Sequence, residues 1–144
     1  MVLSQTAQYA LRAMTVLTAL GPAATARTRD LAGPARVPTD YLSKILRKLV
    51  EAKLLVSEKG HHGGFRLARP AGDITIAEIL DAVDEGIDEN ACAFGFSRCD
   101  ARHPCPLHPL FSELSESVKA WAERSTLADA GPFTRLLTAA VDDR

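Results

Sequence analysis

The chain has 144 residues and a net charge of −1, with 47% hydrophobic and 24% charged residues, which is typical of a single globular domain. No apolar run approaches the ~20 residues that a membrane-spanning helix needs, and the start of the chain lacks the basic and apolar regions of a signal peptide. We therefore expect a cytoplasmic protein without membrane contact, whose three cysteines stay reduced instead of forming a disulfide framework.

The charges are divided unevenly along the chain. Residues 41–69 hold seven Lys and Arg against two Asp and Glu, whereas residues 70–144 hold six Lys and Arg against fourteen acids. A local basic excess on a nearly neutral chain predicts one surface that faces an anion.

The hydrophobic pattern of the first part predicts three helices. The first is expected over residues 4–20, with Ser4 as its N-cap. The second begins at Thr28 and is disturbed or ended early by Gly33-Pro34. The third, capped by Thr39, is amphipathic, with an apolar stripe on one side and polar residues on the others.

Two short strands are predicted next, over 54–57 and 65–68, joined by a Gly-rich turn. Thr75 and Glu78 form a capping-box pattern that begins a further helix, which Gly86 ends. A longer helix with an apolar ridge begins at about Leu107. The ridge packs on its own domain or forms a dimer interface, and we favour the dimer interface.

Three helices followed by a basic hairpin are typical of a winged helix-turn-helix, which binds double-stranded DNA. The polar face of the third helix is then free to enter a major groove, while the hairpin tip approaches the minor groove or its phosphates. For any single lysine, an ordinary solvated surface charge is an equal alternative. The predicted DNA-contacting residues are Thr39, Tyr41, Ser43, Lys44, Arg47, Lys48, Lys59 and His61.

All three cysteines lie in one irregular segment that precedes the long helix. Six residues separate Cys92 from Cys99, five separate Cys99 from Cys105, and His108 follows Cys105 by one helical turn. Thiolates bind soft metals and iron–sulfur clusters, and these gaps are wider than the about two to four residues usual in a zinc knuckle. The alternatives are buried cysteines without a ligand, a zinc site and a thiol switch. His103 and Asp100 are weaker ligand candidates.

The sequence resembles the IscR/NsrR (Rrf-two) family of winged-helix transcription regulators over about residues 2–130. The shared motifs are LSxxxQYALRAM at the start, DYLSKILRKL in the third helix, LLVSEKGHHGGFRLARP through the hairpin, ITIAEILDAVD, and then the three cysteines. The resemblance implies a homodimer, crossed through the long helix, that binds a palindromic promoter site.

The resemblance also implies an iron–sulfur cluster held by Cys92, Cys99 and Cys105. His108 matches the fourth-ligand position of the IscR branch, which carries a 2Fe–2S cluster. Other branches use an acidic residue of the partner's first helix, where this chain has Gln8. This favours a 2Fe–2S cluster, while the gap between the first two cysteines, one residue longer than in typical IscR proteins, leaves a 4Fe–4S cluster open.

We therefore expect a winged helix-turn-helix domain over 1–86, a cluster-binding loop over 87–106, and a dimerisation helix with a tail over 107–144. The expected function is a transcription regulator whose promoter binding is controlled by the cluster in response to iron, redox state or nitric oxide. The alternatives are a regulator that uses the cysteines as a thiol switch or zinc site, and a small metal or redox protein without DNA binding. No nucleophile–base pattern or phosphate loop predicts an enzyme.

Overall fold

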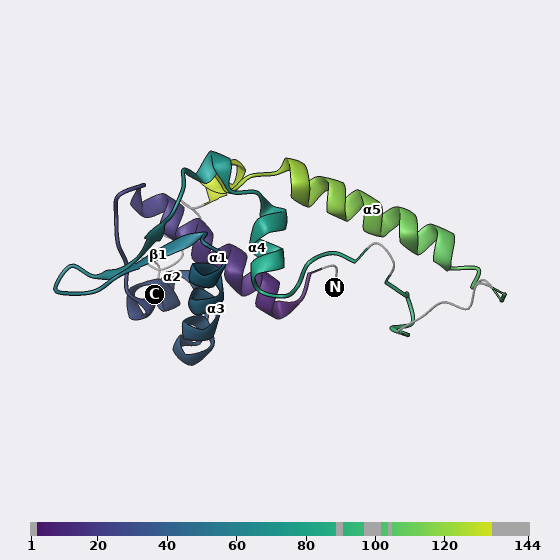
Figure 1. The fold of residues 1–144 in the computed structure, drawn as a ribbon, viewed down its shortest axis with the longest axis horizontal. Helices are drawn as coiled ribbons and strands as arrows, with labels where there is room; N and C mark the ends of the chain where they lie inside the picture. The colour runs from purple at the N-terminus through teal and green to yellow at the C-terminus, as the bar shows by residue number, and fades with distance from the viewer. Residues whose placement is uncertain (1–2, 89–90, 97–101, 104, 134–144) are drawn as a thin grey trace.

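The computed structural model describes residues 3–88, 91–96, 102–103 and 105–133 (Figure 1). The predictions for Cys99, Asp100 and most of the C-terminal tail lie outside these residues. The described elements are, in chain order, α1 (Gln5–Leu20), α2 (Thr28–Ala35), α3 (Thr39–Glu51), β1 (Leu55–Glu58), β2 (Gly64–Leu67), the 3₁₀-helix η1 (Ala71–Asp73), α4 (Ile76–Ala82), α5 (His108–Arg124) and the 3₁₀-helix η2 (Leu127–Phe133). No described helix is long and apolar enough to cross a membrane.

The helices α2, α3 and α4 pack around α1, and this arrangement forms the core (Figure 1). Met14 and Leu17 of α1 are fully buried, as are Leu42, Leu46 and Leu49 on one stripe of α3. Each such side chain contributes about 1.5–3 kcal/mol when it leaves water. Burial of this stripe leaves the polar side of α3 exposed. The described fold is mainly helical with one antiparallel hairpin, which confirms the predicted fold class.

Two predicted helix starts are confirmed in their capping contacts. The Ser4 hydroxyl accepts a hydrogen bond from the Ala7 N–H at 3.1 Å and caps α1. At α4, the Thr75 hydroxyl accepts from the Glu78 N–H at 3.1 Å, while the Glu78 carboxylate accepts from the Thr75 N–H at 2.9 Å. Both patterns act within one turn, which is why the sequence reveals them.

The predicted boundaries of α2 and α3 were partly wrong. Thr39 is the first residue of α3 and not its cap, because Pro38 takes the cap position. The α2 helix continues through Pro34 to Ala35. A proline in the last turn removes only one N–H bond, so the helix tolerates it there and ends at Arg36, whose φ of 55° is left-handed.

The end of α4 and the limits of the strands also differ from the prediction. The α4 helix ends at Ala82, before the Gly86 that we expected to end it, and Asp84 follows with a left-handed φ of 60°. The Glu85 N–H then donates to the Leu80 carbonyl at 2.9 Å, as in a Schellman motif. β1 begins one residue later, and β2 one residue earlier, than the sequence predicts.

The hairpin, or wing, gains a third short segment from the connection between α1 and α2. Ala26 pairs with Phe65 through two backbone hydrogen bonds of 3.0 and 2.8 Å. The neighbouring Gly64 has φ of 146°, and a Cβ there would lie 2.7 Å from the Ala26 carbonyl carbon. The close approach of the two backbones therefore requires glycine.

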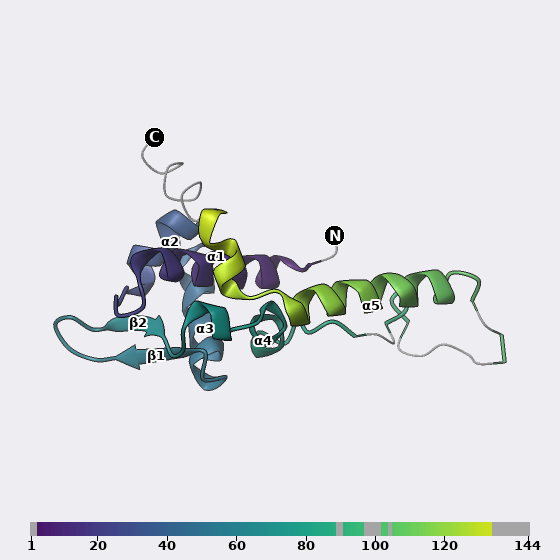
Figure 2. The ribbon, with the colours of Figure 1, turned by 90° about the horizontal axis from the view of Figure 1, so that it is seen from above.

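The α5 helix extends away from the rest of the molecule and is attached at its C-terminal end (Figures 1 and 2). There the Ile76 N–H donates to the Ser125 carbonyl at 2.9 Å, and the Leu127 N–H donates to the Ile74 carbonyl at 2.8 Å. Leu127 is fully buried. The N-terminal end of α5 consequently lies at the opposite end of the molecule from the wing (Figures 1 and 2).

Candidate DNA-binding surface and cysteine segment

The polar face of α3 presents the predicted base-contacting residues to solvent. Thr39, Tyr41, Ser43 and Lys44 are all exposed. The Ser43 hydroxyl donates to the Thr39 carbonyl at 3.1 Å. The Tyr41 ring lies edge-on to the ring of Tyr9 from α1, with 5.9 Å between the centroids. The contact with Tyr9 restrains the Tyr41 ring, whereas the Lys44 side chain makes no hydrogen bond or ion pair with the described residues.

The two predicted phosphate contacts at the end of α3 differ in their surroundings. Arg47 is exposed, whereas the Lys48 ammonium lies 2.9 Å from a carboxylate oxygen of Asp84. Asp84 lies directly after α4, so this ion pair joins α3 to the start of the segment that leads to the cysteines. The Lys48 side chain is 43% exposed and that of Asp84 80%, and such pairs at the surface contribute at most about 1 kcal/mol.

The tip of the wing presents Lys59, His61 and His62 to solvent. The two histidine rings lie edge to face with centroids 5.6 Å apart. Three carbonyls of the tip accept hydrogen bonds from the α1–α2 connection: the Thr25 hydroxyl donates to His62 at 2.9 Å, and the Arg27 guanidinium donates to His61 at 3.2 Å and to Gly60 at 3.5 Å.

The cysteine segment brings two of the four predicted cluster ligands, Cys105 and His108, into one turn that leads into α5. His108 is the first residue of α5, and its N–H donates to the Cys105 carbonyl at 3.0 Å. The helix can begin there because Pro109, which has no N–H, is tolerated in a first turn. Cys92, Cys105 and His108 are half-buried, while His103 is exposed.

The structure does not gather these side chains into a ready metal site. Within the described ranges, no three His, Cys, Asp or Glu side chains are close enough together to hold a metal ion, so Cys92 is not assembled with Cys105 and His108. Cys99 lies outside the described residues. The donor chemistry, three thiols and an imidazole, nevertheless fits an iron–sulfur cluster better than a hard cation.

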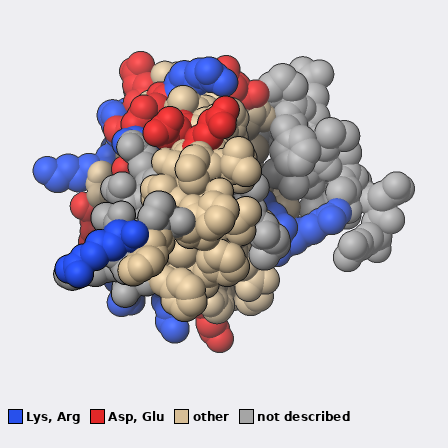
Figure 3. All heavy atoms as spheres, turned by 90° about the vertical axis from the view of Figure 1, so that its right-hand side faces the viewer, with Lys and Arg blue, Asp and Glu red and all other residues tan. Residues whose placement is uncertain are grey.

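The apolar ridge of α5 is mostly exposed. Leu110 is 66% exposed, Leu114 51% and Trp121 38%. Uncharged side chains also cover the middle of the surface viewed from this end of the molecule, and acidic ones gather along its top (Figure 3). A helix with this much apolar surface in water is typical of an interaction site.

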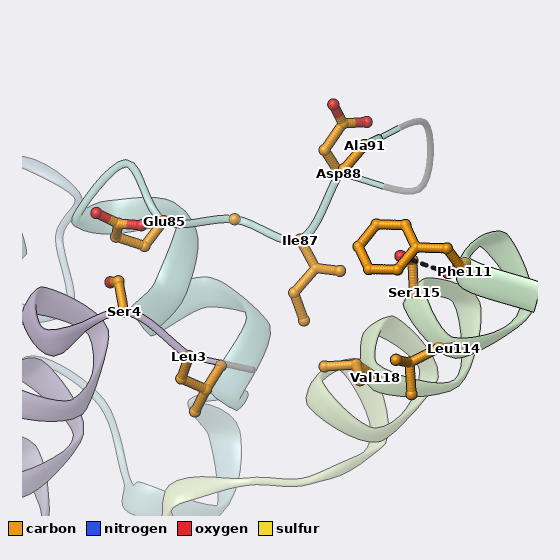
Figure 4. Close-up of a pocket in the computed structure, with 11 residues that line it drawn as sticks. Leu3, Ser4, Glu85, Ile87, Asp88, Ala91, Phe111, Leu114, Ser115 and Val118 are labelled. Carbon is orange, nitrogen blue, oxygen red and sulfur yellow. Dashed lines mark hydrogen bonds between the residues drawn. The ribbon is translucent and has the colours of Figure 1, made fainter. Parts of the chain in front are cut away.

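A groove of about 480 Å³ lies where α5 faces the N-terminus and the segment after α4. The side chains of Leu3, Ile87, Phe111 and Val118 converge on this space (Figure 4). The groove continues the exposed ridge of α5 toward the rest of the molecule.

Several contacts near the DNA-binding elements were not predicted from the sequence. Arg12 lies over the Tyr9 ring at 5.4 Å, and Thr25 and Arg27 contact the wing. Asp84 pairs with Lys48. The contact of Arg27 with the wing and the ion pair of Asp84 with Lys48 each join residues more than 30 positions apart, so no local sequence pattern predicts them.

The helical order, the exposed face of α3 and the attached basic hairpin define a winged helix-turn-helix DNA-binding protein. The chain belongs to the Rrf2 family, whose model, described as "Iron-dependent Transcriptional regulator", matches residues 3–131. It is therefore a DNA-binding transcriptional regulator and not an enzyme, and the alternative of a metal or redox protein without DNA binding was wrong.

Relatives agree with this assignment. The chain is 29% identical over 129 residues to the HTH-type transcriptional regulator IscR of Vibrio atlanticus, covering 90% of this chain and 74% of that protein. It is 33% identical over 128 residues to a Mycobacterium tuberculosis protein whose name assigns it provisionally to the HTH-type transcriptional regulators, covering 88% and 79%.

Solved structures share the fold. The structure of CymR, the global cysteine regulator of B. subtilis, matches with a TM-score of 0.75 at 20% identity, covering 90% of this chain and 95% of that chain. The structure of T. potens IscR matches with a TM-score of 0.69 at 20% identity, covering 98% and 89%.

Proposed function

We propose that this chain is a homodimeric regulator whose promoter binding is controlled by an iron–sulfur cluster held by Cys92, Cys99, Cys105 and His108. The observation that carries the proposal is the turn before α5, where the N–H of His108, the first residue of the helix, donates to the Cys105 carbonyl at 3.0 Å. This turn ends the segment that contains every cysteine of the chain. The family description and the relatives named IscR support an iron-dependent function. The 2Fe–2S form is favoured because His108 matches the fourth-ligand position of the IscR branch.

In this proposal, residues 1–86 bind DNA, residues 87–106 hold the cluster, and residues 107–144 form the dimer. Thr39, Tyr41, Ser43 and Lys44 contact base edges, since they lie exposed at the start of α3. Arg47, Lys48, Lys59 and His61 contact phosphates, with Lys48 exchanging Asp84 for DNA.

The exposed ridge of α5 supports the dimer. Its apolar side chains Leu110, Leu114 and Trp121 are exposed, whereas a monomeric globular protein rarely exposes a continuous row of large apolar side chains. Two copies packed through α5 would present two α3 helices related by a two-fold axis, which matches a palindromic promoter site.

When bound, the cluster supplies a group that responds to iron and redox state. The chain's own residues connect it to DNA binding. Cys105 and His108 lie at the start of α5, and the chain directly after α5 is hydrogen-bonded to the start of α4 through Ser125 and Leu127. A change at the first turn therefore alters how the two α3 helices are spaced, and with it the affinity for a two-fold site.

Anaerobic purification followed by absorbance, Mössbauer spectroscopy and iron and sulfide assays tests the cluster. The protein should be coloured and contain iron and sulfide, and Cys92→Ala, Cys99→Ala and Cys105→Ala should each abolish retention. His108→Ala should weaken retention or alter the spectrum, whereas the matched control His103→Ala, an exposed histidine of the same segment, should do neither. A colourless protein after reconstitution refutes the cluster, stoichiometric zinc assigns a zinc site, and a metal-free response to peroxide assigns a thiol switch.

The DNA-binding surface is tested by Lys44→Ala. Its affinity for duplex DNA should fall, and the slope of log affinity against log salt should become shallower by about 0.9 for one lost phosphate contact, or stay unchanged for a base contact. The control Lys119→Ala removes the same charge from α5. Normal DNA binding by Lys44→Ala would show that α3 is wrongly placed as the recognition helix.

A further inference from the structure

The backbone at the tip of the wing is held by the α1–α2 connection. We call Thr25, Ala26 and Arg27 the wing clamp. Ala26 pairs with Phe65, the Thr25 hydroxyl donates to the His62 carbonyl at 2.9 Å, and the Arg27 guanidinium donates to His61 at 3.2 Å and Gly60 at 3.5 Å. Three consecutive carbonyls of the tip therefore have partners from a segment more than 30 residues earlier in the chain.

The hairpin by itself gives the tip little support. Each strand has four residues, and pairing ends at Glu58 and Gly64. Beyond that pair, the one backbone hydrogen bond found within the described tip is from the Gly63 N–H to the Gly60 carbonyl, at 3.0 Å. An isolated two-stranded hairpin is marginally stable in water, so the orientation of the tip depends on contacts from outside it.

Arg27 is itself held in place by α2. It occupies the N-cap position of this helix, and its N–H donates to the Asp30 carboxylate at 3.1 Å. Its backbone therefore belongs to the first helix of the helix-turn-helix, while its side chain contacts the wing. One residue thus joins the first helix of the helix-turn-helix to the wing, which carries the predicted DNA contacts Lys59 and His61.

We propose that Arg27 is a positioning residue for DNA binding. Its guanidinium holds the wing tip in the orientation in which Lys59 and His61 meet the DNA backbone, and it acts through these residues instead of contacting DNA itself. A flexible tip would lose conformational entropy when it binds DNA, and this loss would weaken binding. Because the clamp already orders the tip in the free protein, less entropy is lost on binding. The inference rests on the proposed contact of the wing with DNA.

Arg29 provides a matched control. It carries the same charge two positions later, is exposed, and within the described part of the chain its side chain has no hydrogen-bond or ion-pair partner. Removal of either arginine changes the net charge equally, so a difference between Arg27→Ala and Arg29→Ala reports the contact with the wing and not the charge.

The first measurement uses a labelled duplex selected from a randomised library with the unsubstituted dimeric protein. Arg27→Ala should lower the affinity about five- to tenfold, in line with the loss of a charged hydrogen bond. Arg27→Lys, which can reach one carbonyl but cannot bridge two, should recover part of the loss, and Arg29→Ala should change the affinity by less than about twofold. In a Lys59→Ala/His61→Ala background, Arg27→Ala should have almost no further effect, because the residues it positions are gone.

The second measurement needs no DNA. Trypsin cleaves after Lys59, and the rate of this cut, followed by mass spectrometry, should rise several-fold in Arg27→Ala but not in Arg29→Ala, with the melting temperature unchanged in both. Equal cleavage in the two variants overturns the clamp, whatever the DNA result. An undiminished effect of Arg27→Ala on affinity in the Lys59→Ala/His61→Ala background makes Arg27 a direct DNA contact and overturns the positioning role. Faster cleavage with unchanged affinity refutes the contact of the wing with DNA and leaves the clamp as a structural contact only.

Discussion

Replacement of Gly64 by alanine should destabilise the protein through its contact with Ala26. Gly64 begins β2 with φ of 146°, a conformation that residues with a Cβ rarely adopt, and the added Cβ would lie 2.7 Å from both the carbonyl carbon and the carbonyl oxygen of Ala26. These atoms are backbone, so they cannot move aside as a flexible side chain would.

The expected cost is the sum of two effects. The left-handed backbone costs an alanine about 1 kcal/mol. Relief of the clash must move Ala26 away from β2, which weakens its two hydrogen bonds with Phe65, each contributing about 1 kcal/mol. Gly64→Ala should therefore lower the free energy of unfolding by about 3 kcal/mol.

Gly60→Ala separates the two effects. Gly60 has φ of 106°, but a Cβ there meets no atom within 4 Å, so this variant has the strained backbone without the clash and should lose only about 1 kcal/mol. Urea unfolding followed by circular dichroism, at a fixed protein concentration and with equal m-values, measures both. Equal losses for Gly64→Ala and Gly60→Ala would refute the close approach of Ala26 to β2.

Four further predictions concern other parts of the chain. Gly33→Ala should stabilise the protein by about 0.5–1 kcal/mol in urea unfolding, because Gly33 lies inside α2 with open space around it; a destabilised variant would contradict the helix there. The hydrogen bond from the Thr75 N–H, helped by Arg69 and opposed by partial burial, lowers the pKa of Glu78 below 4.5, so its contribution to stability is complete above that pH and is lost as the pH falls through the lowered pKa. Glu78→Gln should accordingly flatten the acid side of the stability profile, and an unchanged profile would refute the capping contact. Asp84→Asn, which keeps a residue that tolerates the left-handed turn but frees Lys48, should raise DNA affinity by roughly two- to fivefold in a salt titration, whereas a lower affinity would show that the ion pair aids binding. Leu110→Glu should shift the protein toward monomer in analytical ultracentrifugation while Leu20→Glu, an exposed leucine of α1, does not, and a dimer that survives Leu110→Glu would place the interface elsewhere.

Local sequence patterns correctly predicted those features of the fold that depend on residues close together in the chain. The cap at Ser4, the capping box at Thr75 and the buried stripe of α3 all depend on residues within one or two turns, and the structure confirms them. The end of α2 was harder because the same Gly33-Pro34 pair breaks a helix interior but is tolerated in a last turn.

Contacts between distant segments could not be predicted in this way. The bond from Arg27 to the wing and the ion pair of Lys48 with Asp84 join surfaces that meet only when the whole domain has folded. The cysteine segment shows the same limit, since residue types indicate soft ligands while the described residues place only Cys105 and His108 on one turn. The roles of these ligands and of the exposed side chains of α3 therefore stay predictions.

The attachment of α5 at one end makes the helix a lever. Its 17 residues span about 25 Å from His108 to the hydrogen bonds at Ser125 and Leu127, which serve as the pivot. Over that length, a shift of about 2 Å at the first turn corresponds to a rotation of only about 5° at the pivot. A rearrangement of the cysteine segment would thus reach the body of the protein as a small rotation of α5 against α4 and not as a large translation.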